Sequence, residues 1–177
     1  MKRNKGNNKN NLDKNLAENR RSFFDYEIIE KFEAGLVLTG QEVKSIKLGR
    51  IGLAGSYVVS KQSSRGGLPE FYLIGANIPP YQPQNAPASY NQERSRKLLL
   101  RKAEIKYLIG KINQKSLTLI PLRVYTVKGN IKLEFGIGKG KKRFDKREAI
   151  KKREINKEIE RELKIRGWSA SMENQPK

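Results

Sequence analysis

The chain has 177 residues, enough for one domain with terminal extensions, and carries a net charge of +20. A field of that size implies an anionic partner, either nucleic acid or an anionic membrane surface. No apolar run approaches the roughly 20 residues that a spanning helix needs, and no apolar segment follows the basic N-terminus, so the sequence indicates neither a membrane role nor a signal peptide. We therefore expect a cytoplasmic protein.

The chain contains no cysteine and no histidine. The missing cysteine excludes disulfides, zinc ribbons and thiol chemistry. The missing histidine excludes Ser-His triads, His-metal sites and the usual general base near neutral pH. The carboxylates form no D-x-D or similar cluster that would gather a metal. The sequence therefore predicts a protein that is not an enzyme and uses no cofactor or metal.

Residues 1–17 are rich in lysine and asparagine and have almost no apolar content. Such a segment cannot bury enough surface to offset the entropy lost on ordering, so we expect a disordered basic arm. Order should begin near Glu18. From there the alternation of apolar and polar residues predicts a strand over residues 26–32, a turn at residues 33–35, and a second strand from Leu36.

A short helix is expected next. Thr39 and Glu42 have the spacing of a capping box, in which each side chain accepts a hydrogen bond from the other residue's backbone N–H. Gly49 supplies the C-terminal stop. A basic stripe, which we define as Lys44, Lys47 and Arg50, would flank this helix. By itself such a stripe is more often a solvated helix face than a binding site.

Two strands are predicted over residues 56–60 and 70–74, joined by a Ser/Gly-rich loop. Four prolines between residues 79 and 87 then predict an extended loop. The basic run of residues 94–97 would lead into a helix. The apolar residues of that helix follow the i, i+3, i+4, i+7 spacing of a buried stripe, and they are Ile105, Leu108, Ile109 and Ile112.

Residues 117–127 predict a long strand, in which Pro121 must lie at a bulge or an edge because it has no N–H for a ladder. Residues 131–137 show the cleanest alternation and predict a strand with one buried face. Short strands with inserted helices favour a mainly β fold over residues 18–138, namely a small OB-like antiparallel barrel with a few flanking helices. The patterns alone leave a plain α+β sandwich open.

Three glycines fall within residues 136–140, and we interpret them as a flexible exit from the folded domain into a basic tail over residues 139–177. The basic run that follows includes Phe144 and Asp145. Lys and Arg neutralise phosphates, and an aromatic ring stacks on an unpaired base, so this mixture suits structured RNA. A solvated basic tail is the simpler alternative. The later tail has about one apolar residue per turn, so we expect it to be disordered alone and helical on an anionic surface.

Seven sequence blocks carry a family resemblance: ENRRSFFDYEI, EAGLVLTGQEVKSIKLGR, SYVV, NIPPY, ERSRKLLL, PLRVY and GKGKKRFDKREAIKKRE. In this order they resemble the SsrA-binding proteins, the small protein partner of bacterial transfer-messenger RNA. The resemblance implies an OB-like barrel that binds the tRNA-like part of that RNA, stands in for the missing anticodon arm, and serves the rescue of stalled ribosomes by trans-translation. It also implies a tail that becomes helical on the ribosome and occupies the decoding centre and the empty mRNA channel.

Matched position by position, the resemblance implies two sets of site residues. The RNA-binding set of the barrel is Asn19, Arg20, Tyr26, Glu33, Lys44, Arg50, Arg94, Arg96 and Lys97. The ribosome-binding set of the tail is Gly140, Lys141, Lys142, Phe144, Asp145, Lys146 and Arg147. Glu33 is unusual beside phosphates. It would accept hydrogen bonds from base or ribose donors, orient a neighbouring basic side chain, or simply close the expected turn.

The implied partners are transfer-messenger RNA, the ribosome through small-subunit rRNA at the decoding centre, and elongation factor Tu and alanyl-tRNA synthetase through the charged RNA. The protein itself would be a monomer. Two departures from the family are Phe24, where His is frequent, and Phe144, where His or Tyr is usual, so only stacking survives there. Beyond Arg153 the likeness is one of character only, and Trp168 has no counterpart.

Two other classes of protein fit parts of the sequence. A basic structural protein, ribosomal or nucleoid-type, fits the charge equally well, but it would not require the glycine-rich segment followed by a long, weakly apolar helix former. A nuclease is the enzymatic alternative, against which the missing histidine and the missing acidic cluster argue.

Overall fold

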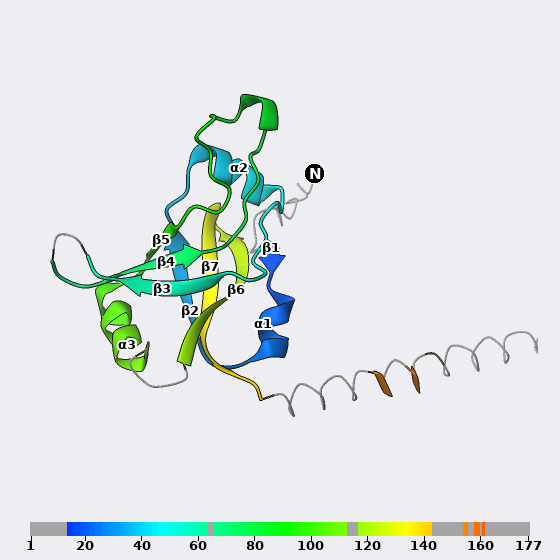
Figure 1. Ribbon diagram of the computed structural model, residues 1–177, viewed down its shortest axis with the longest axis vertical. Coiled ribbons are helices and arrows are strands. Elements are labelled where there is room, and N and C mark those ends of the chain that lie inside the picture. Colours follow the sequence, from blue (N-terminus) through cyan, green and yellow to red (C-terminus); the bar gives the residue numbers. More distant parts are fainter. Residues whose placement is uncertain are drawn as a thin grey trace, which may run out of the picture. The chain divides into compact units, whose positions relative to one another are not determined.

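The structure is a computed structural model and describes residues 14–63, 66–112, 117–142, 154–155, 158–159 and 161. Its folded part contains seven strands, three α-helices and one 3-10 turn (Figure 1). In chain order they are β1 (Asn15–Glu18), α1 (Arg20–Asp25), β2 (Tyr26–Leu36), α2 (Gly40–Lys47), β3 (Tyr57–Lys61), β4 (Glu70–Ile74), η1 (Pro83–Asn85), β5 (Arg96–Leu99), α3 (Lys102–Ile112), β6 (Leu117–Val127) and β7 (Asn130–Gly140). None of the helices in the described part is long and apolar enough to cross a membrane.

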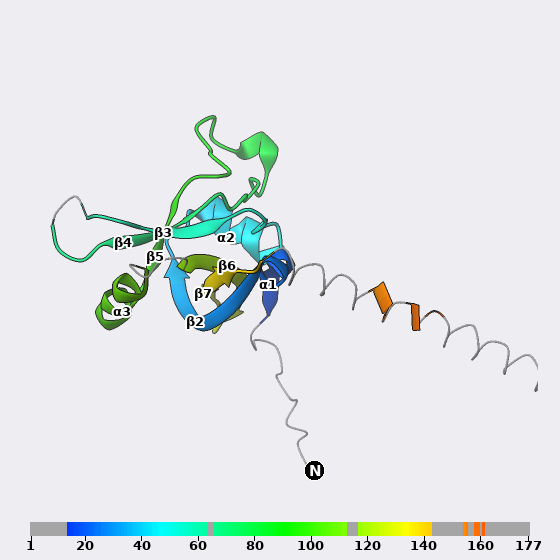
Figure 2. The same cartoon turned by 60° about the horizontal axis from the view of Figure 1, so that its bottom comes forward.

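The strands form one antiparallel sheet that closes into a small barrel. Around the ring, β6 pairs with β7, β7 with β2, β2 with β5, β5 with β4 and β4 with β3. The ring closes where Val58 of β3 pairs with Leu119 of β6, and β1 adds a further strand along β6. Figure 2 shows β2 curving around one side of the barrel. The expected class, a mainly β OB-like barrel with a few flanking helices, is confirmed.

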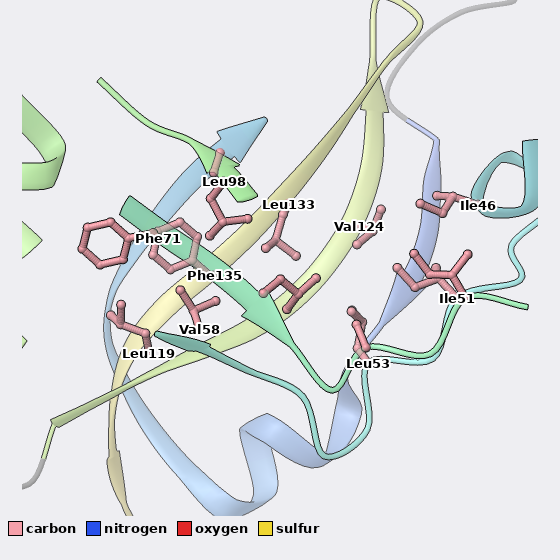
Figure 3. Close-up of a cluster of buried hydrophobic side chains, with 14 of the residues drawn as sticks. Ile46, Ile51, Leu53, Val58, Phe71, Leu98, Leu119, Val124, Leu133 and Phe135 are labelled. Carbon is pink, nitrogen blue, oxygen red and sulfur yellow. The ribbon is translucent and has the colours of Figure 1, made fainter. Parts of the chain in front are cut away.

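The interior of the barrel is apolar, because alternate residues of each strand point inward. Figure 3 shows Phe71 of β4, together with Leu133 and Phe135 of β7, among the side chains of this core. The core reaches α2 through Ile46, which is fully buried. The apolar spacing that predicts a helix after the basic run is also confirmed, since α3 buries Leu108 completely.

The predicted turn at residues 33–35 is wrong, because β2 continues to Leu36. These residues pair with β7, and the side chain of Ala34 lies in the core. A Cβ at Gly35 would lie 3.3 Å from the Cβ of Leu99 on the neighbouring β5. The glycine therefore gives room to a neighbouring strand, and the chain does not turn here.

The predicted flexible exit at residues 136–140 is also wrong, because β7 extends to Gly140. Gly136 and Gly138 are buried, and a Cβ at either position would meet the barrel wall. It would lie 2.8 Å from Cγ2 of Ile28 at the first position and 2.6 Å from Cδ1 of Ile120 at the second. Close packing of β2 and β6 against β7 is what requires these glycines. The compact unit accordingly ends at Gly140, and a second unit begins at Lys141.

The N-terminal boundary also differs from the expected one. β1 begins at Asn15, inside the arm expected over residues 1–17, because Leu16 and Ala17 pack against the core. Residues 1–13 lie outside the described part of the chain. The basic run of residues 94–97 leads first into β5, and α1 is a further element that the patterns do not predict.

Two local signals in the sequence are confirmed. Thr39 and Glu42 form the predicted capping box at the start of α2. Pro121 lies at an irregularity of β6, where the register with β7 shifts. Both signals depend on a few adjacent residues, which is why the sequence alone is sufficient to find them.

Candidate nucleic-acid interface

Two arginines of the predicted barrel set form an internal cluster with Glu42, which we call the buried ion cluster. Nε of Arg96 donates to Oε1 of Glu42 at 2.9 Å, and its two terminal nitrogens donate to the carbonyls of Ala76 at 2.5 Å and Gln92 at 2.6 Å. Arg94 donates to both oxygens of Glu42, through Nε at 2.9 Å and Nη2 at 2.5 Å. The Glu42 carboxylate thus joins α2 to β5 through Arg96, and to the loop before β5 through Arg94.

Electrostatics and exposure assign the cluster a structural role. Burial opposes ionisation of Glu42, but hydrogen bonds from Arg94, Thr39 and Arg96 outweigh it, so the pKa of Glu42 is lowered. The side chain of Arg96 is 0 % exposed and that of Arg94 is 32 % exposed. The RNA-binding role predicted for Arg96 is therefore corrected, because its guanidinium is enclosed by protein partners. Arg94 is the one cation through which the cluster's net positive charge reaches solvent.

Asn19 is likewise buried, and it bridges a gap in the barrel. The edge of β6 pairs with β3 at Leu119 and with β1 at Arg123. Between these points Nδ2 of Asn19 donates to the carbonyls of Pro121 at 3.1 Å and Leu53 at 3.2 Å. Asn19 thereby supplies hydrogen-bond donors at the point where the partner of β6 changes from β3 to β1. Pro121, at the same point, has no backbone N–H to donate. Its contacts in this structure are those of a structural residue.

The outer face of β2, β7 and β6 carries a second charged group, the strand-face network: Lys31, Glu33, Arg123, Tyr125, Lys132 and Glu134. Glu33 accepts a hydrogen bond from the hydroxyl of Tyr125 and an ion-pair contact from Nζ of Lys132 at 3.0 Å. The hydrogen bond from Tyr125 and then that from Lys132 lower the pKa of Glu33, so the carboxylate is held ionised. Burial and Glu33 together raise the pKa of Tyr125, which stays neutral.

Glu134 connects the other members of this network. It accepts from Nη2 of Arg123 at 2.7 Å and lies 3.3 Å from Nζ of Lys31. The guanidinium of Arg123 lies 5.0 Å from the centre of the Tyr125 ring. Of the six residues only Glu33 belongs to the predicted set. Period-two alternation on β6 and β7 was a usable signal for the others, since it places Arg123 with Tyr125, and Lys132 with Glu134, on one face.

The basic stripe of α2 lies beside the loop between β4 and β5. Nζ of Lys44 lies 5.5 Å from the centre of the Tyr81 ring, and Nη1 of Arg50 donates to the Tyr81 carbonyl at 3.4 Å. Oγ of Ser45 fixes the loop by donating to the Pro79 carbonyl at 2.6 Å. Figure 1 shows this loop standing against α2. Exposed cations therefore lie next to an aromatic ring, an arrangement that suits nucleic acid.

The remaining predicted residues are dispersed. The side chain of Arg20 is exposed and lies 3.9 Å from Glu18, Tyr26 is half-buried at the start of β2, and Lys97 pairs with Glu70 at 2.5 Å. Gly140 ends β7, and Lys141 and Lys142 follow it. Outside the described residues lie Phe144, Asp145, Lys146 and Arg147. The predicted set thus divides into buried structural residues and several exposed basic surfaces.

An OB-like barrel with exposed cations beside aromatic rings, on a chain of net charge +20, defines a basic protein of the oligonucleotide-binding class. In the part of the chain that the structure describes, no three His, Cys, Asp or Glu residues gather as metal ligands would. The family is shown by sequence. The sequence model of the SmpB protein family matches residues 16–165, and the chain belongs to this family.

Curated relatives and a solved structure support the same family assignment. The chain is 46% identical over 149 residues to the SsrA-binding protein of Cupriavidus pinatubonensis, covering 84% of this chain and 95% of that one. It is 45% identical over 156 residues to the SsrA-binding protein of Carboxydothermus hydrogenoformans, covering 88% and 99%. A solved structure described as "tmRNA-SmpB: a journey to the center of the bacterial ribosome" is similar with a TM-score of 0.57 and 40% identity, covering 76% of this chain and 93% of that one.

Proposed function

We propose that this protein binds transfer-messenger RNA and acts with it on stalled ribosomes in trans-translation, in the bacterial cytoplasm. The observation that carries the proposal is the likeness, at 40% identity over most of the chain, to the SmpB protein of the tmRNA–SmpB structure. The protein is not an enzyme in this proposal. Binding energy steered by charge performs the function.

The barrel binds the tRNA-like part of the RNA and stands in for its missing anticodon arm. Two exposed surfaces support this role: the basic stripe with Tyr81, and the strand-face network. In the network Glu33 is 46 % exposed and ionised, and Lys132 and Tyr125 fix its position. Oxygen lone pairs that these two do not use accept hydrogen bonds from base or ribose donors. The turn-closing interpretation of Glu33 no longer applies, because β2 has no turn there.

The tail reads the decoding centre and the empty mRNA channel, starting at Gly140, Lys141 and Lys142 and continuing through residues 143–147. Elongation factor Tu and alanyl-tRNA synthetase join the complex through the charged RNA, and the protein acts as a monomer. The family resemblance and the positive charge that follows β7 support this division of labour.

Co-purification from growing cells tests the proposal. Full-length protein should enrich transfer-messenger RNA over total RNA, whereas a basic ribosomal or nucleoid protein would bring down ribosomal RNA or DNA. A chain truncated after Lys142 keeps all of β7 and should retain RNA binding while losing the tagging of stalled peptides. Loss of RNA binding on truncation would contradict the division between barrel and tail.

The basic stripe has its own test. If affinity depends on phosphate contacts, log K falls with log salt by roughly 0.7 to 0.9 per contact. Replacing Lys44, Lys47 and Arg50 by glutamine should flatten that slope by about two to three. Glutamine at three other exposed lysines, Lys61, Lys102 and Lys106, is the charge-matched control. An equal effect of both triples would show that only total charge matters.

A further inference from the structure

A pocket of about 520 Å³ lies between the start of α2 and the end of the loop that precedes β5. We call it the loop pocket. Its chemically distinctive wall residues are Gly40, Gln41, Lys44, Tyr90, Asn91 and Arg94. The family resemblance implies a role for Lys44 and Arg94 but none for Gln41, Tyr90 or Asn91.

The walls of the loop pocket are fixed by buried interactions. Arg96 holds the two ends of the loop together, because it donates to the carbonyls of Ala76 and Gln92. The hydroxyl of Tyr90 donates to the Ile78 carbonyl at 2.9 Å, and the backbone N–H of Glu93 donates to Oδ1 of Asn91 at 2.8 Å. Binding in such a pocket would require little reorganisation.

The wall residues combine the three kinds of group that a nucleotide needs. Lys44 is one cation, and Arg94 presents the net positive charge of the buried ion cluster, so both attract a phosphate. Tyr90 uses its hydroxyl within the loop, which leaves its ring for stacking. Gln41 and Asn91 offer amide groups to base edges. Oε1 of Gln41 is buried and, among the described residues, accepts no hydrogen bond. If the Gln41 amide turns toward the pocket, a donor on the ligand would satisfy this oxygen.

The N-terminus of α2 is not the anion site here. Thr39 and Glu42 already cap it, and the carboxylate of Glu42 occupies the first turn. A phosphate is therefore directed to the Lys44 and Arg94 side of the pocket, away from the helix N-terminus.

We propose that the loop pocket binds one unpaired nucleotide of the RNA partner. Its base lies against Tyr90 with an N–H donor toward Gln41, and its phosphate lies toward Lys44 and Arg94. The inference rests on the proposed function, since it assumes an RNA partner. It adds a site at which the protein reads a single extruded nucleotide.

Gly40 provides a clean way to block the pocket. A Cβ at this position meets nothing within 4 Å, and Gly40 lines the pocket and opens α2. Alanine therefore fits without a clash and favours the helix, and we expect the longer side chain of leucine to occupy the pocket. Gly40→Leu is the blocking variant and Gly40→Ala is the matched control. The probes are AMP, CMP, GMP and UMP, with inorganic phosphate alone as the reference, followed through backbone amide NMR shifts.

At least one monophosphate should shift the amides of Gln41 and residues 89–91 more than inorganic phosphate does, in the wild type and in Gly40→Ala but not in Gly40→Leu. Gly40→Leu should also weaken binding of the tRNA-like RNA roughly tenfold, which is the effect expected for one lost base stack. Gln41→Leu should weaken it less and leave the fold intact.

The outcomes separate this inference from the proposed function. If the wild type binds transfer-messenger RNA but no monophosphate shifts the pocket, the inference is overturned and the proposed function stands. Monophosphate shifts with an unchanged RNA affinity of Gly40→Leu would overturn the use of the pocket by this RNA. If the pocket responds but no transfer-messenger RNA binds, the proposed function fails and the nucleotide pocket survives.

Discussion

The buried ion cluster and the strand-face network are made of similar residues and behave in opposite ways. Glu42 and Arg96 have side chains that are 1 % and 0 % exposed, whereas Glu33 and Arg123 are each 46 % exposed. In the cluster each of the three guanidinium nitrogens of Arg96 donates to a protein acceptor. In the network the corresponding carboxylate and guanidinium, those of Glu33 and Arg123, lie at the surface. Residue type therefore does not distinguish a basic residue that holds the fold from one that can meet RNA.

The largest expected effect comes from breaking the buried ion cluster. Arg96→Met roughly keeps the volume of the side chain but leaves Glu42 with one cation instead of two and removes the hydrogen bonds to the Ala76 and Gln92 carbonyls. Removing one partner of a buried ion pair costs about 3 to 5 kcal/mol. Urea unfolding should show a loss of that order. The exposed counterpart, Arg123→Met, should cost about 1 kcal/mol or less.

One result would contradict this contrast between the buried ion cluster and the strand-face network. If Arg96→Met retained full stability and lost RNA binding, Arg96 would be an RNA contact after all.

A smaller effect is expected at the glycines of β7. Gly138→Ala places a Cβ 2.6 Å from Cδ1 of Ile120, and overpacking of this kind costs about 1 to 3 kcal/mol. Gly140→Ala is the matched control, since its Cβ would meet nothing within 4 Å. Thermal unfolding of the two variants measures the difference. Equal melting temperatures would restore the interpretation of these glycines as a flexible exit.

These cases show what the sequence can and cannot predict. The capping box of Thr39 and Glu42 and the bulge at Pro121 are correctly predicted, because the cause of each lies within a few residues. The turn at residues 33–35 and the exit at residues 136–140 are wrong because both predictions attribute glycine to local freedom. At Gly35 and Gly138 the cause is a side chain on another strand, Leu99 in one case and Ile120 in the other.

The predictions for the candidate site also divide by whether their cause is local or lies far away in the sequence. The position of Arg96 inside the protein depends on Glu42, which is 54 residues away in the sequence. The strand-face network depends on the register of three strands, so the resemblance finds Glu33 but not its partners Tyr125 and Lys132. The basic stripe is predicted correctly as a surface feature, because it belongs to one short helix and the residues just after it.

Acid should weaken the fold mainly through Glu42. Its pKa is lowered from 4.5, so the unfolded chain binds more protons as the pH falls, and stability that is present above about pH 4.5 is lost through the lower pKa. The pKa of Glu33 is lowered too, but the solvent around this exposed group screens its contribution. Melting temperatures between pH 7 and pH 3 should therefore fall similarly in the wild type and in Glu33→Gln. A flat profile in Glu33→Gln would make the exposed network the acid-sensitive element.

The smallest expected effect on stability, and the sharpest on function, is that of Glu33→Gln. Replacing an exposed carboxylate by its amide should change the free energy of unfolding by about 0.5 kcal/mol or less. Removing a negative charge from an RNA-facing surface would by itself strengthen RNA binding. If the carboxylate accepts hydrogen bonds from the RNA, Glu33→Gln should instead weaken binding, because the amide presents one acceptor oxygen where the carboxylate presents two. Titration with the tRNA-like RNA therefore distinguishes the two cases, because the affinity of Glu33→Gln rises in one and falls in the other.

The control for this sign test is Glu134→Gln, which removes the same charge from a carboxylate that is only 13 % exposed and pairs with Lys31 and Arg123. It should leave binding unchanged or slightly stronger, because that carboxylate points its oxygens at protein cations. Weakening by Glu33→Gln alone would place Glu33 at the RNA. Strengthening by both variants would mean that the network only tunes the field of the surface, and that the contacts lie on the basic stripe and in the tail.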